Sequence, residues 1–177
     1  IISTGMASIE DIELALRAVE QAGGDVPVLL KCPSHYPADA RHANLNTMVD
    51  MRSRFEVPVG LSDHSLGIGV AVAATALGCC VIEKHLVLSR KSGTVDAAFS
   101  MEPAELRPLT EECRRASVAL GVVQYGPVDT ATDPYEHRRS IYVARDIAAG
   151  ERLTEANLRV IRPGHGLPPR HLAEVLG

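Results

Sequence analysis

A short β-branched run followed by a helix-like segment recurs four times in the first two-thirds of the chain, and this repeat constrains the fold most. The expected strands cover residues 1–2, 26–31, 59–61 and 80–83. Between them, apolar residues at helical spacing predict helices, and another is expected to begin near Pro103. Strands that alternate with helices in this way predict right-handed βαβ units and a parallel sheet.

Two of the expected helices have candidate capping residues at their starts. Ser8, with Asp11 three residues later, has the spacing of a capping box. Asn44 is expected to cap the helix that runs from about residue 45 to residue 55.

Two α/β architectures can hold such units: half of an eight-stranded (β/α)8 barrel, or an open doubly wound sheet. A dinucleotide-binding sheet carries Gly-x-Gly-x-x-Gly after its first strand. No expected strand of this chain is followed by that motif, and no phosphate-binding loop is present. We therefore expect the α/β fold of the TIM-barrel family.

Composition is that of an ordinary water-soluble globular protein. The chain has 177 residues, of which 46% are hydrophobic and 23% charged. No apolar run approaches the ~18 residues of a membrane-spanning helix, and the first residues do not read as a signal peptide, so we expect a cytoplasmic protein with no membrane partner. A net charge of −4, two Phe, four Tyr and no Trp argue against nucleic-acid binding.

The character of the chain changes near Gly121. Residues 121–137 are rich in Gly, Pro, Asp and Thr with weak periodicity, which indicates a linker. Beyond it we expect strands at 139–143 and 160–161, a brief helix capped by Thr154, and a final helix over 168–176. The predicted domains are thus residues 1–120 and 138–177, joined by the linker.

Two histidines follow the third and fourth expected strands. His64 follows Val59–Asp63 and His85 follows Val81–Lys84, 21 residues later. If the two runs are neighbouring parallel strands, both imidazoles emerge at one sheet edge, where they can bind one metal ion. A single histidine in such a place is more often a polar loop residue than a ligand, so the pairing carries the hypothesis.

Six motifs in order resemble the sialic acid synthase family, whose members join a metal-dependent barrel to a small antifreeze-like (SAF) domain. The motifs are ISTGM at 2–6, LKCPSHYP at 30–37, VGLSDH at 59–64, VIEKH at 81–85, FSMEP at 99–103 and IRPG at 161–164. The resemblance implies that residues 1–120 are the C-terminal half of the barrel and that residues 138–177 are a truncated SAF domain.

Within the family, the segments at 96–103, 123–127 and 161–167 resemble pseudaminic acid synthases. Such an enzyme condenses phosphoenolpyruvate with 2,4-diacetamido-2,4,6-trideoxy-altrose, giving a nonulosonic acid and phosphate. N-acetylneuraminate and legionaminate synthases, which share the mechanism, remain alternatives. A non-catalytic sugar-binding protein or an inactive fragment is the alternative of another class.

The resemblance also implies a role for individual residues. It makes His64 and His85 the ligands of a divalent metal, Mn²⁺ or Mg²⁺, that polarises the sugar aldehyde. The residues expected to bind phosphoenolpyruvate are Ser3, Ser34 and Ser62. Those expected to face the N-acetylated amino sugar are Tyr36, Glu83 and Asp96, the two carboxylates being the candidate catalytic groups. Lys31 and Lys84 are expected to be structural or salt-bridging rather than catalytic.

Arg162 matches the arginine with which the family's antifreeze-like domain reaches the active site of a partner subunit. The resemblance therefore implies a domain-swapped homodimer. Family members also carry earlier barrel strands that bear an essential carboxylate and phosphate-binding lysines. We therefore expect the isolated chain to be inactive.

Overall fold

The computed structural model of the chain describes residues 1–128, 131 and 133–177, which divide into two units, residues 1–121 and 122–177. The expected linker over 121–137 includes residues 129, 130 and 132, which lie outside the described residues.

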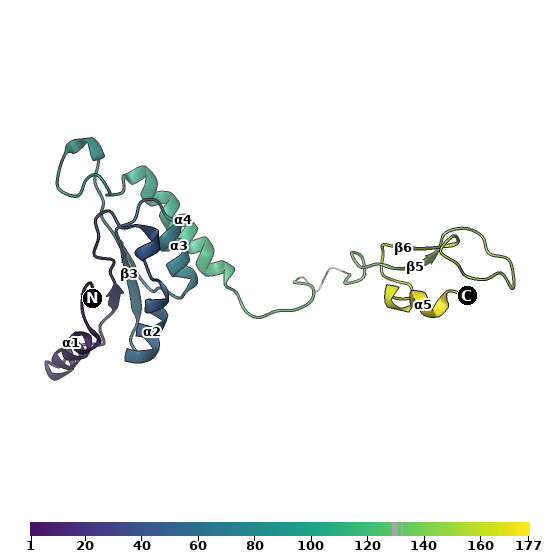
Figure 1. The fold of residues 1–177 in the computed structure, drawn as a ribbon, viewed down its shortest axis with the longest axis horizontal. Coiled ribbons are helices and arrows are strands. Elements are labelled where there is room, and N and C mark those ends of the chain that lie inside the picture. The colour runs from purple at the N-terminus through teal and green to yellow at the C-terminus, as the bar shows by residue number, and fades with distance from the viewer. Residues whose placement is uncertain (129–130, 132) are drawn as a thin grey trace. The chain divides into compact units, whose positions relative to one another are not determined.

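Four parallel strands form the sheet of the first unit (Figure 1), in the order in which they occur along the chain. They are β1 (Ile2–Ser3), β2 (Leu29–Lys31), β3 (Val59–Asp63) and β4 (Ile82–Lys84). Every neighbouring pair is parallel, which confirms the predicted βαβ units. Because the strands are parallel, their carboxyl ends and the loops that follow them meet at one edge of the sheet.

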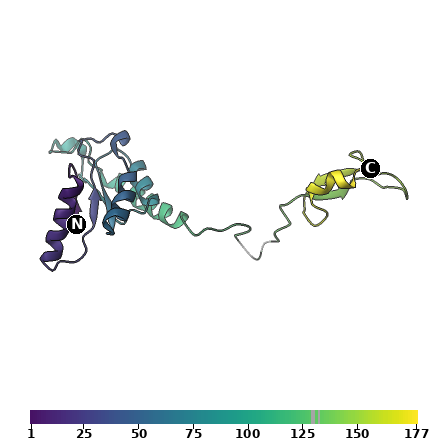
Figure 2. The same cartoon turned by 60° about the horizontal axis from the view of Figure 1, so that its bottom comes forward.

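A helix follows each strand, and the helices cover one face of the sheet. They are α1 (Ile9–Gln21), α2 (Asn46–Phe55), α3 (Gly69–Ala76) and α4 (Pro103–Ala119). Short 3-10 turns lie at Ala40–His42 and Arg90–Ser92. Figure 1 shows α2, α3 and α4 beside the strands, and Figure 2 shows the dark purple helix α1 running alongside a strand of the sheet.

The apolar core lies between the sheet and these helices. Leu29, Val59 and Leu61 are buried in one cluster with Ile12 of α1 and Met51 of α2. Since strand side chains alternate, Leu29, Val59 and Leu61 lie on the helix-facing side of β2 and β3, together with Lys31 and Asp63 at the ends of these strands.

The intervening residues Leu30, Gly60 and Ser62 face the opposite side of the sheet. A Cβ at Gly60 would lie 2.6 Å from the backbone carbonyl oxygen of Val81, so only glycine fits at this position. This second face of the sheet continues into His64 and His85.

One of the two predicted helix caps is confirmed and the other is wrong. The Asp11 amide donates to Ser8 Oγ and the Ser8 amide donates to Asp11 Oδ2, as a capping box requires. Asn44 does not cap α2: it has a φ of 44°, and its side-chain amide donates to the carbonyl of His42 instead. The Asn44 side chain is therefore hydrogen-bonded to the preceding turn at Ala40–His42 and cannot cap the helix.

The second unit is built on an antiparallel pair, β5 (Ser140–Val143) and β6 (Leu158–Ile161), followed by a 3-10 turn at Pro169–His171 and α5 (Leu172–Val175). The predicted brief helix after Thr154 is wrong. The side chain of the fully buried Asn157 accepts the Thr154 amide proton and donates to the Arg152 carbonyl, which folds the segment into a turn. No helix among the described residues is long and apolar enough to cross a membrane.

Candidate active site

The two predicted metal-ligating histidines meet at the carboxyl edge of the sheet. Asp63 of β3 pairs with Lys84 of β4, so His64 and His85, one residue further on, leave the sheet at the same level. Their ring centroids are 5.0 Å apart and the rings lie at 69° to one another. The juxtaposition expected from two neighbouring parallel strands is confirmed.

His64 is buried, with 4% of its surface exposed, and its Nδ1 lies 3.1 Å from the carbonyl oxygen of Pro33. A carbonyl can only accept a hydrogen bond, so Nδ1 carries the proton. In the neutral ring the lone pair then lies on Nε2, and this is the form of imidazole that binds a metal. The loop after β2 thus fixes the tautomer of a histidine that follows β3.

His85 is half-buried and lies next to a carboxylate. Its Nδ1 is 3.7 Å from Asp96 Oδ2, which is too long for a hydrogen bond but places Asp96 beside the histidine pair. Asp96 has a φ of 65°, in the left-handed region that a short polar residue tolerates better than a bulky one. The chain turns sharply there and brings Phe99 back against His85, with ring centroids 5.2 Å apart.

Two further aromatic contacts complete the cluster. The ring of Tyr36 lies 4.4 Å from that of His64 and 5.5 Å from that of Phe99, measured between centroids. Phe99 is 8% exposed and Tyr36 is 55% exposed. Sequence reasoning named Tyr36 but missed Phe99 as a site residue, although a lone aromatic in a chain with only two Phe was a usable signal.

Ser62 and Glu83 are paired across the strands, and the Ser62 hydroxyl donates to Glu83 Oε1 over 2.6 Å. A hydroxyl bonded to a carboxylate is typically this short because the charge strengthens the bond. Ser62 is 2% exposed, whereas Glu83 is exposed. Ser62, predicted to contact phosphoenolpyruvate, and Glu83, predicted to face the sugar, are therefore hydrogen-bonded to each other.

The other two serines predicted to bind phosphoenolpyruvate lie at the end of β1 and in the loop after β2. Ser3 ends β1 and is exposed, and Ser34 is half-buried in the loop after β2. A Cβ at Gly5 would lie 2.8 Å from Ser34 Oγ, so the β1 and β2 loops approach each other closely. Among the described residues neither hydroxyl has a hydrogen-bond partner, which leaves both free to donate to a ligand.

Arg162 belongs to the second unit, where it follows β6 and is exposed. It lines, with Arg139, Val160 and Ile161, a cavity of about 350 Å³. Two arginines thus contribute to the cavity, and an anionic group suits this end of the two-stranded sheet.

A buried ion pair holds the two histidine-bearing strand ends together. Lys84 Nζ lies 2.8 Å from Asp63 Oδ2, and the side chains are 5% and 1% exposed. Lys84 also donates to the Ser65 carbonyl, while the Ser65 amide donates to Asp63 Oδ1. The salt-bridging role predicted for Lys84 is confirmed, whereas Lys31 forms no ion pair with any described residue.

A second set of contacts ties down the loop that carries Asp96 and Phe99. The Arg90 amide donates to Glu102 Oε1, its Nε donates to the Ser100 carbonyl, and its guanidinium pairs with Glu105 on α4. The base of the loop is closed by the Met101 amide, which donates to the carbonyl of His85.

Among the described residues, no group of three or more His, Cys, Asp and Glu side chains is arranged to hold a metal ion. The histidine pair supplies two imidazole nitrogens, and substrate or water can fill further positions of a divalent ion. Hydroxyl donors, carboxylates and a tyrosine surround it, so the arrangement suits a phosphorylated or carboxylated substrate together with a polar second substrate.

Comparison with protein families matches residues 1–125 to the NeuB family and residues 138–177 to the SAF domain. The chain is 37% identical to the N,N'-diacetyllegionaminic acid synthase of Legionella pneumophila, over 100% of this chain and 51% of that protein. It is also 37% identical to the pseudaminic acid synthase of Campylobacter jejuni, over 100% of this chain and 52% of that protein. The chain thus spans about half the length of the curated relatives it matches.

Among solved structures, the N-acetylneuraminic acid synthetase of Leptospira borgpetersenii matches with a TM-score of 0.65 and 37% identity, over 71% of this chain and 44% of that one. A spore coat polysaccharide biosynthesis protein of Bacillus subtilis matches with a TM-score of 0.65 and 28% identity, over 98% of this chain and 54% of that one. With the parallel sheet, these matches confirm the predicted fold class, an α/β chain of TIM-barrel type followed by a SAF domain.

We predict that Asp63→Asn destabilises the first unit strongly, because it leaves the buried Lys84 ammonium without its counter-ion. Breaking a buried pair in this way costs about 3–5 kcal/mol. Urea unfolding followed by circular dichroism measures the change. Asp50→Asn is the matched control, since Asp50 forms an exposed pair with Arg54 on α2 and its loss should cost less than about 1 kcal/mol. Equal effects of the two variants would contradict the structural role of the buried pair.

We also predict that acid loosens the loop over residues 86–101. The pKa of Glu105 lies below its ordinary value of 4.5, first because its carboxylate accepts the Glu102 amide proton and then because it pairs with Arg90. A carboxylate with a lowered folded-state pKa contributes stability that is present above its unfolded pKa and is lost as the pH falls through the folded one. Amide hydrogen exchange in the loop, corrected for intrinsic rates, should therefore be faster at pH 3.5 than at pH 7.

Arg90→Gln should speed the same exchange at pH 7. Arg115→Gln serves as its control, because Arg115 is exposed and pairs with Glu112 within α4 rather than with a residue of the loop. Unchanged loop exchange in Arg90→Gln would show that the loop is held by other means.

Proposed function

This chain belongs to the NeuB family, and on that premise we propose that it is the metal-holding half of a nonulosonate synthase. The reaction proposed is the condensation of phosphoenolpyruvate with the open-chain aldehyde of an N-acetylated amino sugar, giving a nonulosonic acid and phosphate. The main support for the proposal is the juxtaposition of His64 and His85, whose ring centroids are 5.0 Å apart, with the His64 tautomer fixed by the Pro33 carbonyl.

His64 and His85 would hold the divalent cation, Mn²⁺ or Mg²⁺. Their fit to such an ion rests on the donor set: neutral imidazoles, one with a free Nε2 lone pair, at the ends of two strands. When bound, a divalent cation supplies Lewis-acid polarisation of the sugar aldehyde. The buried pair of Asp63 and Lys84 keeps the two imidazoles at that spacing.

The chain's other groups have separate tasks. Ser3 and Ser34, whose hydroxyls are unpartnered among the described residues, donate to phosphoenolpyruvate. Ser62, whose proton is donated to Glu83, would contact the same ligand only by turning that hydroxyl away from the carboxylate. Glu83, oriented by the Ser62 hydroxyl, accepts hydrogen bonds from the sugar or from the water that reaches C2 of the former enol. Each of these roles needs a group held at the carboxyl edge of the sheet, and the register of β3 and β4 holds Ser62 and Glu83 side by side there.

Asp96 and Tyr36 complete the sugar side. The Asp96 carboxylate, which lies next to His85, would accept a hydrogen bond from a hydroxyl of the sugar. Tyr36, whose ring packs against His64, would offer its exposed hydroxyl to the same sugar. Arg162 would reach the acceptor from the SAF domain of a second copy, which makes the proposed assembly a domain-swapped homodimer. We also propose that the enzyme works in the cytoplasm.

The acceptor we propose is 2,4-diacetamido-2,4,6-trideoxy-altrose, which makes the enzyme a pseudaminic acid synthase. The Campylobacter jejuni relative named as such supports this choice. The Legionella pneumophila relative, named a diacetyllegionaminic acid synthase, has the same 37% identity and makes legionaminate synthesis the second candidate.

The metal site is tested by titrating Mn²⁺ into the chain by calorimetry. We predict saturable binding that His64→Ala and His85→Ala each weaken more than about 100-fold, since loss of a group that merely orients a ligand already costs about 10- to 100-fold. His42→Ala is the control, because His42 is exposed in a separate turn. Binding that survives both histidine variants would remove the metal site from the proposal.

The acceptor is tested with this chain joined to the first half of a barrel, for which the Campylobacter jejuni relative supplies the matching residues. Phosphate release and product mass are measured with phosphoenolpyruvate, Mn²⁺ and each amino sugar. We predict turnover with the diacetamido-trideoxy-altrose and none by the 177-residue chain alone. Preference for a hexose with a 6-hydroxyl and one acetamido group would contradict the pseudaminate assignment.

A further inference from the structure

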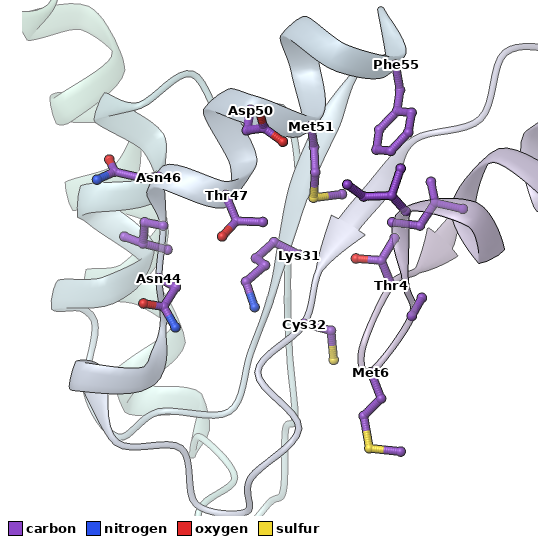
Figure 3. A pocket seen from close by; sticks show the side chains of 14 residues that line it. Thr4, Met6, Lys31, Cys32, Asn44, Asn46, Thr47, Asp50, Met51 and Phe55 are labelled. Atoms are coloured by element: carbon purple, nitrogen blue, oxygen red, sulfur yellow. The ribbon is translucent and has the colours of Figure 1, made fainter.

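A cavity of about 560 Å³ opens between α1 and α2, beside the carboxyl ends of β1 and β2 (Figure 3). This volume is in the range of small-molecule sites, which are mostly apolar with a few polar groups that fix orientation. Ile12 and Met51, members of the main apolar cluster, and Phe55, which packs against that cluster, line one part of it. Lys31 and Thr47 supply polar groups to the rest.

The Lys31 ammonium is the exceptional group in this cavity. Its side chain is half-buried, and among the described residues it has neither an ion-pair nor a hydrogen-bond partner. Figure 3 shows it extending into the space between Asn44 and Cys32. Lys84, by contrast, is satisfied by a carboxylate and a carbonyl.

The cavity therefore carries one uncompensated positive charge. The only other charged side chain that lines the described cavity is Asp50, whose carboxylate is already held by Arg54 over 3.0 and 3.1 Å. A partly desolvated ammonium is stabilised by an anion, and a single one matches a monoanion. A phosphate dianion would bring two charges to one lysine with the Asp50 carboxylate nearby.

The hydrogen-bond donors and the apolar surface of the cavity restrict further the chemical class of ligand that it suits. The Thr47 hydroxyl, which has no hydrogen-bond partner among the described residues, lies on the side of α2 that Figure 3 shows facing Lys31. A carboxylate can accept from both groups at once. The apolar surface of Ile12, Met51 and Phe55 then suits a short hydrocarbon body.

We propose that this cavity binds a small carboxylic acid with an apolar body, its carboxylate on Lys31 and Thr47 and its body against Ile12, Met51 and Phe55. Lys31 shares its face of β2 with the core residue Leu29, so the cavity lies on the helix-facing side of the sheet. His64 and His85 follow strand positions on the opposite face of the sheet. The site is thus separate from the proposed condensation, and either proposal can fail without the other.

The test is a titration of hexanoate into the full chain, followed by amide chemical shifts. We expect saturable shifts at Lys31 and Thr47, and a loss of affinity of about tenfold or more in Lys31→Met, the scale of a hydrogen bond to a charged group. Lys31→Arg should restore binding to within about threefold. Lys91→Met is the control, because Lys91 is exposed and far along the chain in another loop.

Two parallel titrations, with 1-hexanol and with inorganic phosphate, separate the contributions of body and charge. Each should bind at least about tenfold more weakly than hexanoate. The proposal is overturned if hexanoate shifts no cavity amide, if Lys31→Met binds as well as the wild type, or if phosphate binds as tightly as hexanoate. A native-like amide spectrum of each variant shows that any lost binding is not lost folding.

Discussion

The buried pair of Lys84 and Asp63 is the constraint on which the candidate active site depends. Both charged groups are almost fully buried, so each is stable only with the other as counter-ion. The Ser65 carbonyl accepts a further hydrogen bond from the Lys84 ammonium, and the Ser65 amide donates to the second oxygen of Asp63. The ion pair joins β3 to β4 one residue before each histidine. The spacing of the two imidazoles is therefore set by packing on the helix-facing side, away from the ligand.

The sheet thereby separates structural and chemical groups by strand alternation. Positions that face the helices hold the core and the ion pair, while positions that face the other way hold the Ser62–Glu83 bond and lead into the histidines. Loops then add what strands cannot supply: the Pro33 carbonyl, which fixes the His64 tautomer, and Asp96 at a sharp turn. Rigid strands place the proposed ligands and the loops orient them.

Much of this arrangement could be predicted from the sequence because it follows from period and spacing. Alternating strands and helices predict a parallel sheet, and a parallel sheet brings His64 and His85 to one edge. The Ser8 capping box is equally local. By contrast, the failure of Asn44 as a cap and of the helix after Thr154 came from side chains that bond to a competing turn.

Contacts between distant segments could not be predicted in this way. The carbonyl of Pro33 carries no signal in the sequence, because any residue has one, and only the folded loop brings it to His64. Lys31 and Lys84 look alike in sequence, each ending a strand, yet one is fully paired and the other faces a cavity. The difference lies in the partner that the neighbouring strand or helix supplies.

The central claim is that the fold presents His64 and His85 as a preformed pair with a metal-ready tautomer. A long-range proton–nitrogen spectrum of the histidine side chains at neutral pH tests it most directly. The account predicts that His64 carries its proton on Nδ1, as the contact with Pro33 requires, and that substoichiometric Mn²⁺ broadens the ring signals of both histidines together. A proton on His64 Nε2, or broadening of only one ring, would contradict it.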